Sequence, residues 1–376
     1  MPEFAFDALR RWPDLEAPNL HAVDAADRLI LDEGAPLIEA CGPGDLVVIG
    51  DQYGALTLGA AAQGADGIRV HQDPLSGERA LAANAARTGL ARSFRSAALD
   101  AGLLAEARLV LMRLPRQLEA LDEIATLVAA HADPDVVVIA GGRLKHMTVA
   151  MNEVLGRSFG GVSATLARQK SRLLVARGPL DQARERVGSW PAHEHHADLG
   201  LEVCAHGAAF AGTRVDIGTR FLLGFLDDML PDARQAIDLG CGTGVLATSL
   251  ARARPALAVT ATDQSAAAVA SARATAEANE VADRVRVVRD DGLAAQPEAS
   301  ADLIVLNPPF HVVASVHTGV ALALFEHAGR VLRPGGELWT VWNSHLGYRL
   351  ALERLVGPTR QAGRNPKFTV TVSTGR

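Results

Sequence analysis

The second half of the chain contains an acid and a run of glycines that could bind a small ligand. Asp238 is followed at alternate positions by Gly240, Gly242 and Gly244, and a helix is expected over 245–253. Glycines let the backbone turn tightly and approach a ligand closely, and the start of a helix adds N–H donors. Taken alone, this glycine spacing would also suit a dinucleotide.

Two further acidic residues indicate which kind of ligand the site could bind. Asp263 and Asp291 follow the next two strand-like segments, so the chain carries a carboxylate at three successive strand ends. Parallel strands end at the same edge of a sheet, where ligands of open α/β sheets bind. Asp238 could accept an ammonium group, Asp263 both hydroxyls of a ribose, and Asp291 an adenine amino group. Together they predict a site for an adenosine with an amino-acid tail, although each acid alone could be a helix cap or a surface residue.

A second motif, Asn307-Pro308-Pro309-Phe310, ends the apolar run 302–306. Proline fixes φ and has no N–H, so two prolines in succession stop a strand abruptly. The Asn307 side chain and the Pro308 carbonyl could then accept the N–H bonds of a planar amine, while the Phe310 ring stacks on it. Taken alone, the motif could be an ordinary turn.

The segments that must position these residues alternate between strand and helix patterns. In the second half, apolar runs of strand length occur at 235–239, 257–262, 285–288, 302–306 and 337–341. Continuous apolar strands that alternate with helices indicate a parallel sheet covered on both faces. A final apolar stretch, 368–372, suits an antiparallel strand that closes the sheet edge. The predicted fold class is therefore α/β with a doubly wound sheet.

The first half repeats this plan, with strand patterns at 45–50, 68–73, 108–113 and 135–140. When Gly54 is aligned with Gly244, Asp73 falls opposite Asp263. The first copy lacks the middle glycine and the Asn-Pro-Pro motif. These features predict two tandem doubly wound, Rossmann-like domains, of which the N-terminal one is degenerate. Two unrelated α/β domains are the alternative.

The length of 376 residues also favours two domains, because single cores stop growing well below this size. The stretch from Gly178 to Gly200 is polar, has no sustained period and contains both glycine and proline. We therefore expect a degenerate domain at 1–178, a linker at 179–200 and a catalytic domain at 201–376.

The composition is that of a soluble globular protein, with 48% hydrophobic and 21% charged residues. No run approaches the roughly 20 apolar residues that span a bilayer. The N-terminus lacks the basic start and apolar stretch of a signal peptide. A cytoplasmic protein without a membrane partner is expected.

Cysteines and histidines give no support for a metal site. The three cysteines, Cys41, Cys204 and Cys241, are an odd number and widely spaced, which indicates neither a disulfide framework nor a zinc site. His193, His195 and His196 are close enough in sequence to bind a metal, but no second cluster of ligands lies nearby. We therefore predict no metal and a solvated linker.

The charge distribution leaves an RNA partner open. The formal net charge of −6 argues against nucleic-acid binding. However, basic residues outnumber acidic ones in two segments, 143–186 and 330–376. These segments are either an RNA-contacting face or ordinary surface charge.

Together, the motifs resemble a known family. Asp-x-Gly-x-Gly-x-Gly, an acid after the second strand and Asn-Pro-Pro-Phe are similar to class I S-adenosylmethionine-dependent methyltransferases that modify exocyclic or amide nitrogens. The segment Val215–Thr219, His311 after Phe310 and the degenerate first copy resemble bacterial ribosomal RNA guanine-N2 methyltransferases. The stretches Asn343–Tyr348 and Asn365–Phe368 look closer to the large-subunit enzymes of this family.

The resemblance implies S-adenosylmethionine as the cofactor and the N2 amine of a guanine, expected in 23S rRNA, as the acceptor. The implied catalytic residues are Asn307, Pro308, Pro309 and Phe310, and the implied cofactor-binding residues are Asp238, Gly240, Gly242, Gly244, Asp263, Asp291, Gly218 and Thr219. Thr219 could instead be a helix N-cap. His311 either touches the substrate or is structural. The first domain would dock RNA through Arg168, Lys170 and Arg172.

The predicted partner is ribosomal RNA that is naked or incompletely assembled, because a base must leave its stack to reach the motif. A monomer is expected. The alternatives are 16S rRNA as the substrate, or another planar nitrogen such as adenine N6 or a protein glutamine. From a different class, a non-catalytic RNA-binding assembly factor would keep the fold but not transfer methyl groups.

Overall fold

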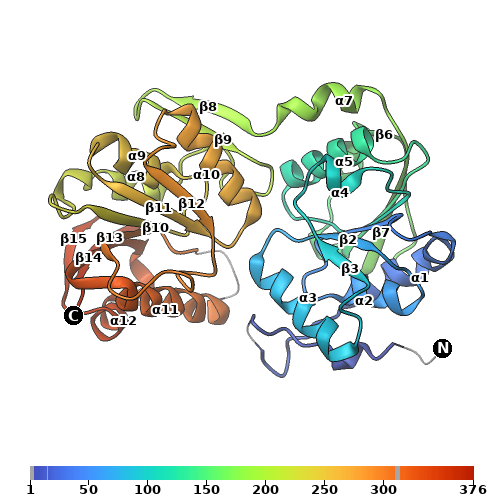
Figure 1. Cartoon of the computed structure of the whole chain (residues 1–376), viewed down its shortest axis with the longest axis horizontal. Coiled ribbons are helices and arrows are strands. Elements are labelled where there is room, and N and C mark those ends of the chain that lie inside the picture. The colour runs from blue at the N-terminus through green and yellow to red at the C-terminus, as the bar shows by residue number, and fades with distance from the viewer. Residues whose placement is uncertain (1–3, 15, 310–313) are drawn as a thin grey trace. The chain divides into compact units, whose positions relative to one another are not determined.

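The computed structural model describes residues 4–14, 16–309 and 314–376. The chain divides into two units, Met1–Trp190 and Pro191–Arg376, and each is built on a seven-stranded sheet (Figure 1). The division falls within the segment 179–200. That segment carries the short helix α7 (Gln182–Arg186) and the strand β8 (Ala192–His196).

The sheet of the second unit has the strand order β12-β11-β10-β13-β14-β16-β15. The bounds are β10 (Gln235–Leu239), β11 (Ala258–Asp263), β12 (Val285–Arg289), β13 (Ala301–Leu306), β14 (Leu332–Asn343), β15 (Thr359–Arg364) and β16 (Phe368–Thr374). Neighbours from β12 to β14 pair in parallel, and β16 pairs antiparallel with β14. The carboxyl ends of β10, β11, β12 and β13 therefore lie at one common edge of the sheet.

The predicted antiparallel strand exists, but its position at the sheet edge was wrong. β15 lies outside β16 and forms the edge. Its sequence, Thr-Arg-Gln-Ala-Gly-Arg, is largely polar, and only the first of these residues is buried. An exposed edge strand needs no apolar run, so the sequence pattern did not reveal it.

Helices cover both faces of this sheet, because its central strands carry buried side chains on both faces. One core joins strand residues such as Val305 and Val341 to α8 (Ile217–Leu223), α9 (Val245–Ala253) and α10 (Ala266–Ala278). The other joins Leu306 and Trp342 to α11 (Ala314–Val331) and α12 (Arg349–Leu355). Successive residues of a strand point to opposite faces, so each strand contributes to both cores. None of the helices in the described part of the chain is long and apolar enough to span a bilayer.

The first unit repeats this architecture with the strand order β3-β2-β1-β4-β5-β7-β6. Its strands are β1 (Leu46–Ile49), β2 (Ile68–His71), β3 (Phe94–Ser96), β4 (Leu109–Arg113), β5 (Val137–Arg143), β6 (Phe159–Ala164) and β7 (Ser171–Pro179). Its helices include α1 (Ala25–Ala40), α2 (Ala55–Ala62), α3 (Leu75–Thr88) and α5 (Leu118–His131). The matching strand order confirms the predicted tandem, doubly wound fold.

Candidate active site

The glycine loop of the second unit joins β10 to α9. Gly240 and Gly242 have φ angles of 72° and 53°, and a Cβ atom added to either would meet no atom within 4 Å. Gly244 has a φ of 78°, and its added Cβ would lie only 2.9 Å from Ala272 of α10. All three positions therefore favour glycine. The first two leave open space for a ligand, and the third allows two helices to pack closely.

Two of the predicted acids hold this loop in place. Asp263 accepts hydrogen bonds from Gly242 N at 3.0 Å and from Ser265 N at 2.9 Å, which ties the loop to the start of α10. Asp238 is only 1% exposed and accepts a hydrogen bond from Ala247 N at 2.9 Å. Each carboxylate oxygen can accept more than one hydrogen bond, so these contacts are compatible with a ligand.

The carboxyl of Asp238 suits a positively charged ligand. Burial, together with the negative charge of Asp263, raises the pKa of Asp238 to about 7. Within the described residues, no basic side chain forms an ion pair with Asp238. A ligand ammonium group would supply the missing positive charge and favour the ionised carboxylate. The residues present therefore fit S-adenosylmethionine, which carries both an ammonium and a sulfonium group.

The third acid lies at the same sheet edge. Asp291 follows β12 and is partly exposed, whereas its neighbour Asp290 is 2% exposed. Asp290 accepts hydrogen bonds from Ala295 N at 3.0 Å and Asp291 N at 2.8 Å, so it organises the loop. The structure thus brings the three predicted acids to the ends of three adjacent strands.

Asn307 follows β13, next to β10, and its amide is held in one orientation. Its Nδ2 donates to Asp216 Oδ2 at 3.0 Å and to Thr219 Oγ1 at 2.9 Å. A carboxylate can only accept, so Nδ2 must face Asp216 and Oδ1 must point away. Oδ1 is buried and has no hydrogen-bond partner within the described residues. A buried carbonyl without a partner is costly, so this oxygen is suited to receive a ligand donor.

The start of helix α8 supplies the two groups that hold the Asn307 amide. Asp216 is its N-cap and accepts hydrogen bonds from Gly218 N at 2.8 Å and Thr219 N at 3.2 Å. The alternative in which Thr219 caps the helix was therefore wrong. A Cβ added at Gly218 would lie 3.4 Å from Asn307 Oδ1, so a side chain there would crowd this oxygen.

The remaining motif residues are placed only in part. Pro308 is buried and Pro309 is exposed. Phe310 and His311 lie outside the described residues, so their roles stay predictions. Sequence reasoning missed Asp216 as a site residue. The available signal was an aspartate directly before a segment that could form a helix, which is typical of an N-cap.

The first unit has a different set of side chains at the equivalent position. Met112 pairs with Ile49 as Leu306 pairs with Leu239, so Arg113 occupies the place of Asn307. Its guanidinium binds Asp24, the N-cap of α1, and Asp27 three residues later. These two acids correspond to Asp216 and Thr219. The buried acceptor of the second unit is therefore replaced by a closed cluster of ion pairs.

The loop of the first unit is also altered. Gln52, with a φ of 58°, stands where the second unit has Gly242. Asp51 is buried, accepts hydrogen bonds from Leu56 N and Thr57 N, and has its pKa raised to about 7 by burial. The carboxylate of Asp51 thus accepts hydrogen bonds from the backbone at the start of α2, so the loop itself caps this helix. Both differences explain how the first copy retains the fold without the site.

The histidines of the predicted linker lie on β8. His193 Nδ1 and His195 Nδ1 lie 3.7 Å and 3.5 Å from Glu202, on the neighbouring strand β9 (Leu201–Ala205). His196 Nε2 donates to Thr213 O at 2.9 Å. Within the described residues, no group of three or more His, Cys, Asp or Glu side chains is arranged to hold a metal.

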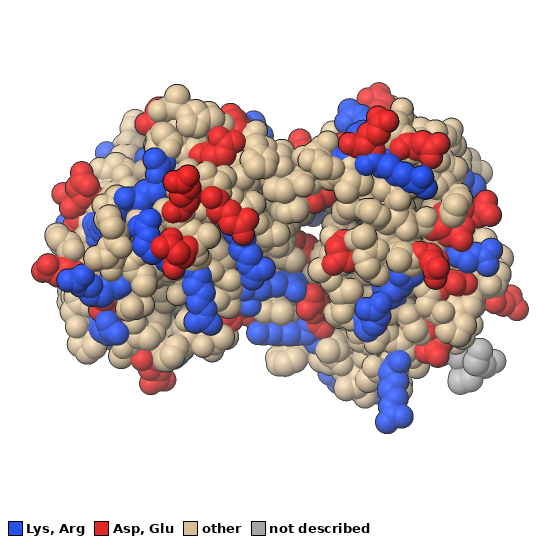
Figure 2. Space-filling model, turned by 45° about the horizontal axis from the view of Figure 1, so that its top comes forward, with Lys and Arg blue, Asp and Glu red and all other residues tan. Residues whose placement is uncertain are grey.

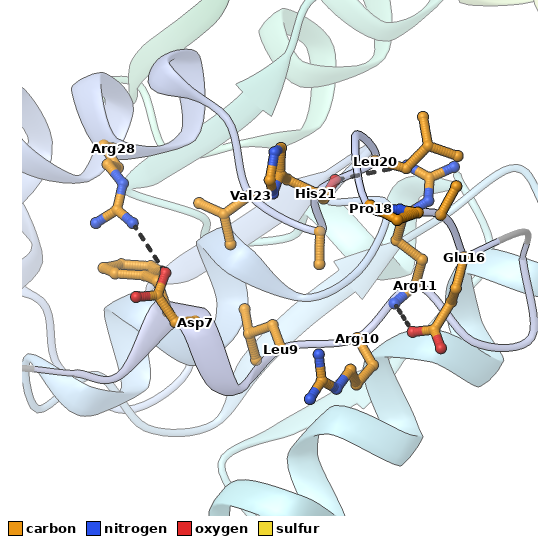
Figure 3. Close-up of a pocket in the computed structure, with 13 residues that line it drawn as sticks. Asp7, Leu9, Arg10, Arg11, Glu16, Pro18, Leu20, His21, Val23 and Arg28 are labelled. Carbon is orange, nitrogen blue, oxygen red and sulfur yellow. Dashed lines mark hydrogen bonds and ion pairs between the residues drawn. The ribbon is translucent and has the colours of Figure 1, made fainter.

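A pocket of about 770 Å³ opens in the first unit, between the N-terminal segment and the start of α1 (Figure 3). Its lining includes an ion pair, with Arg28 3.9 Å from Asp7. The backbone N–H of Arg11 donates to Glu16 Oε1 at 3.2 Å. None of the predicted site residues lines this pocket.

Comparison with known proteins agrees with the geometry. The model of the Methyltransferase small domain matches residues 200–372, and that of the RLMG N-terminal domain matches residues 2–180. The chain also resembles the solved structure of a T. thermophilus 16S rRNA N2 methyltransferase in complex with AdoMet and guanosine. That structure has a TM-score of 0.73 at 22% identity, over 99% of this chain and 100% of the other. The likeness confirms the fold.

The fold and the site of the second unit define a class I S-adenosylmethionine-dependent methyltransferase. Two curated relatives, both named ribosomal RNA large subunit methyltransferase G, cover nearly the whole chain. The one from Streptomyces coelicolor is 35% identical over 96% of both chains, and the one from Pseudomonas paraeruginosa is 36% identical over 98% of this chain and 97% of its own. The chain belongs to the ribosomal RNA large subunit methyltransferase G family. The family resemblance predicted from the motifs is confirmed.

Proposed function

We propose that this protein transfers the methyl group of S-adenosylmethionine to the exocyclic N2 amine of a guanine in large-subunit ribosomal RNA. The observation that carries the proposal is the buried Oδ1 of Asn307, which faces away from Asp216 and has no partner within the described residues. It supplies one fixed acceptor for the amine. Family membership supports ribosomal RNA as the substrate.

The chain's own residues make the amine a better nucleophile. The N2 lone pair of guanine is delocalised into the ring, so the amine is a weak nucleophile. In this proposal Asn307 Oδ1 and the Pro308 carbonyl accept its two N–H bonds, which localises the lone pair on N2. When bound, the cofactor supplies a methyl group on a sulfonium, with the tail ammonium beside Asp238. Positioning and electrostatics account for the acceleration, and N2 loses one proton after transfer.

The first unit offers a cationic surface that could dock RNA. Arg116, Arg143 and Lys145 are exposed at the carboxyl edge of its sheet, and none forms an ion pair within the described residues. Burial lowers the pKa of His146, as do the positive charges of Arg116, Lys145 and Arg143, whereas the charge of Asp24 raises it. Leu144 N bonds to Lys170 O, so the β6–β7 hairpin brings Lys170 beside them.

We place the docking surface on Arg116, Arg143, Lys145 and Lys170. Arg168, also predicted for this role, pairs with Asp32, and Arg172 lies within β7. Figure 2 shows basic and acidic side chains interspersed on the face in view, so a local cluster is a better candidate than a continuous basic field. Exposed cations bind phosphate independently of sequence.

Charge reversal tests this surface. The pair Arg143→Glu and Lys145→Glu should weaken RNA binding by about tenfold or more at moderate salt and flatten its salt dependence. The affinity for S-adenosylmethionine should not change. The matched control reverses Arg87 and Arg92, which are exposed near the end of α3. Equal losses from both pairs would remove the docking assignment.

The reaction itself is tested by methyl transfer to purified ribosomal RNA. Labelled S-adenosylmethionine is supplied with naked 23S or 16S RNA, or with assembled subunits, and the modified nucleosides are identified. The expected product is N2-methylguanosine in naked 23S RNA. We expect the enzyme to act as a monomer. A different methylated nucleoside, or transfer to 16S RNA alone, would contradict the proposal. Preference for assembled subunits would contradict the proposed naked or incompletely assembled substrate.

A further inference from the structure

A second side-chain amide near the site also has an oxygen without a partner. Asn343 is the last residue of β14, the strand next to β13. Its Oδ1 is buried and accepts no hydrogen bond from the described residues. A buried carbonyl that no described residue uses is a candidate acceptor for a ligand.

The strand register puts Asn343 on the same face as Asn307. Leu306 pairs with Thr340, so Asn307 lies level with Val341, and Asn343 follows two residues later. Residues two apart on a strand point to the same face. The two cores show which face this is, because Val341 packs with α8 and α9, while Trp342 packs with α11 and α12.

Phe368 links Asn343 to the start of α8. Phe368 of β16 pairs directly with Asn343, and paired residues of antiparallel strands share a face. A Cβ added at Gly218 would lie 3.4 Å from both the Phe368 ring and Asn307 Oδ1. Asn343 lies on β14, the strand between those of Asn307 and Phe368. The two acceptors therefore belong to one cluster beneath the start of α8.

We propose that Asn343 Oδ1 accepts the N1–H of the target guanine while Asn307 Oδ1 accepts an N2–H. This inference rests on the proposed guanine-N2 activity. In guanine, two ring nitrogens flank the carbon that carries the amine, and one of them, N1, is an N–H donor. In adenine and cytosine the only ring nitrogen beside that carbon is an acceptor, whose lone pair would face a lone pair of Asn343 Oδ1. A second acceptor beside the first therefore selects guanine among bases that carry an amine.

The test compares guanine with 2-aminopurine, which keeps the N2 amine and lacks the N1–H. Short RNAs carry either base at the position identified by the transfer experiment. For the wild-type enzyme, kcat/KM should favour guanine. Asn343→Ala should reduce this preference by about tenfold or more, because only the guanine reaction loses a hydrogen bond. Asn343→Asp keeps an acceptor and should keep most of the preference.

The matched control is Ser344→Ala, because Ser344 adjoins Asn343 but its hydroxyl already pairs with Thr369 at 2.8 Å. Its preference should equal that of the wild type. If Asn343→Ala does not fold, Asn343→Leu provides similar volume without an acceptor. A preference within twofold of the wild type, or an equal slowing of both substrates, would overturn the inference. Failure of the wild type to form N2-methylguanosine would instead contradict the proposed function.

Discussion

If the hydrogen bond between Asp216 and Asn307 orients the catalytic amide, two substitutions of Asp216 should lower kcat to different extents. Asp216→Ala removes the carboxylate that keeps Asn307 Nδ2 on one side and Oδ1 on the other. A hydrogen bond to a charged group contributes about 1.5–3 kcal/mol. Since each 1.4 kcal/mol is a factor of ten, the ratio of correctly oriented to flipped amide should fall by about 10–100-fold, to near one. The correctly oriented fraction then drops from nearly all to about half, so we expect kcat to fall by about twofold or more.

Asp216→Asn separates orientation from folding. Asparagine is as good an N-cap as aspartate, so α8 should keep its start, whereas alanine should cost about 1 kcal/mol of stability. The neutral amide pair is roughly half as strong as the charged one but still favours the correct orientation, so kcat should fall less than in Asp216→Ala. The assay is single-turnover methyl transfer at saturating RNA and cofactor, with cofactor affinity and thermal unfolding measured on the same samples.

The first unit supplies the matched control. Asp24 is the N-cap of α1 and binds Arg113, as Asp216 caps α8 and binds Asn307. Asp24→Ala should therefore lower stability and leave kcat near the wild-type value. The reasoning is refuted if Asp216→Ala turns over at the wild-type rate, or if Asp24→Ala slows turnover equally.

Three further perturbations test other parts of the account. Arg113→Ala leaves Asp27, which is 5% exposed, without its ion-pair partner, so denaturant titration should show a loss of about 3–5 kcal/mol in the first unit. Gly242→Ala places a side chain at a φ of 53° and in the open space of the loop, so calorimetry should show about tenfold weaker cofactor binding or more. The pKa of Asp238 is raised to about 7, so its carboxyl is protonated below that pH and only the ionised form pairs with an ammonium group. The affinity for S-adenosylmethionine should therefore rise about tenfold from pH 6 to pH 8, and this rise should be absent in Asp238→Asn.

Much of the site was predictable because its residues are local in sequence. The glycine loop, the acids after the strands and Asn307 each follow directly from a strand pattern, and a parallel sheet brings strand ends to one edge. The duplication could also be predicted, because Gly54 and Gly244 mark the same turn in both halves.

The features that could not be predicted from the sequence depend on contacts between segments far apart in the chain. Asp216 lies 91 residues before Asn307, and only the packing of α8 on the sheet brings them together. The ion pairs of Arg113 with Asp24 and Asp27 likewise join segments far apart in the chain, which no local pattern encodes. The edge strand β15 was missed because its exposed residues need no apolar period.

The most direct measurement is a crystal structure with S-adenosylhomocysteine and guanosine bound to the second unit of the intact chain. The account predicts that guanine N2 lies at hydrogen-bond distance, about 2.7–3.2 Å, from Asn307 Oδ1, with N2 directed toward the cofactor sulfur. A base bound elsewhere, or one that presents another atom to Asn307 Oδ1, would contradict it.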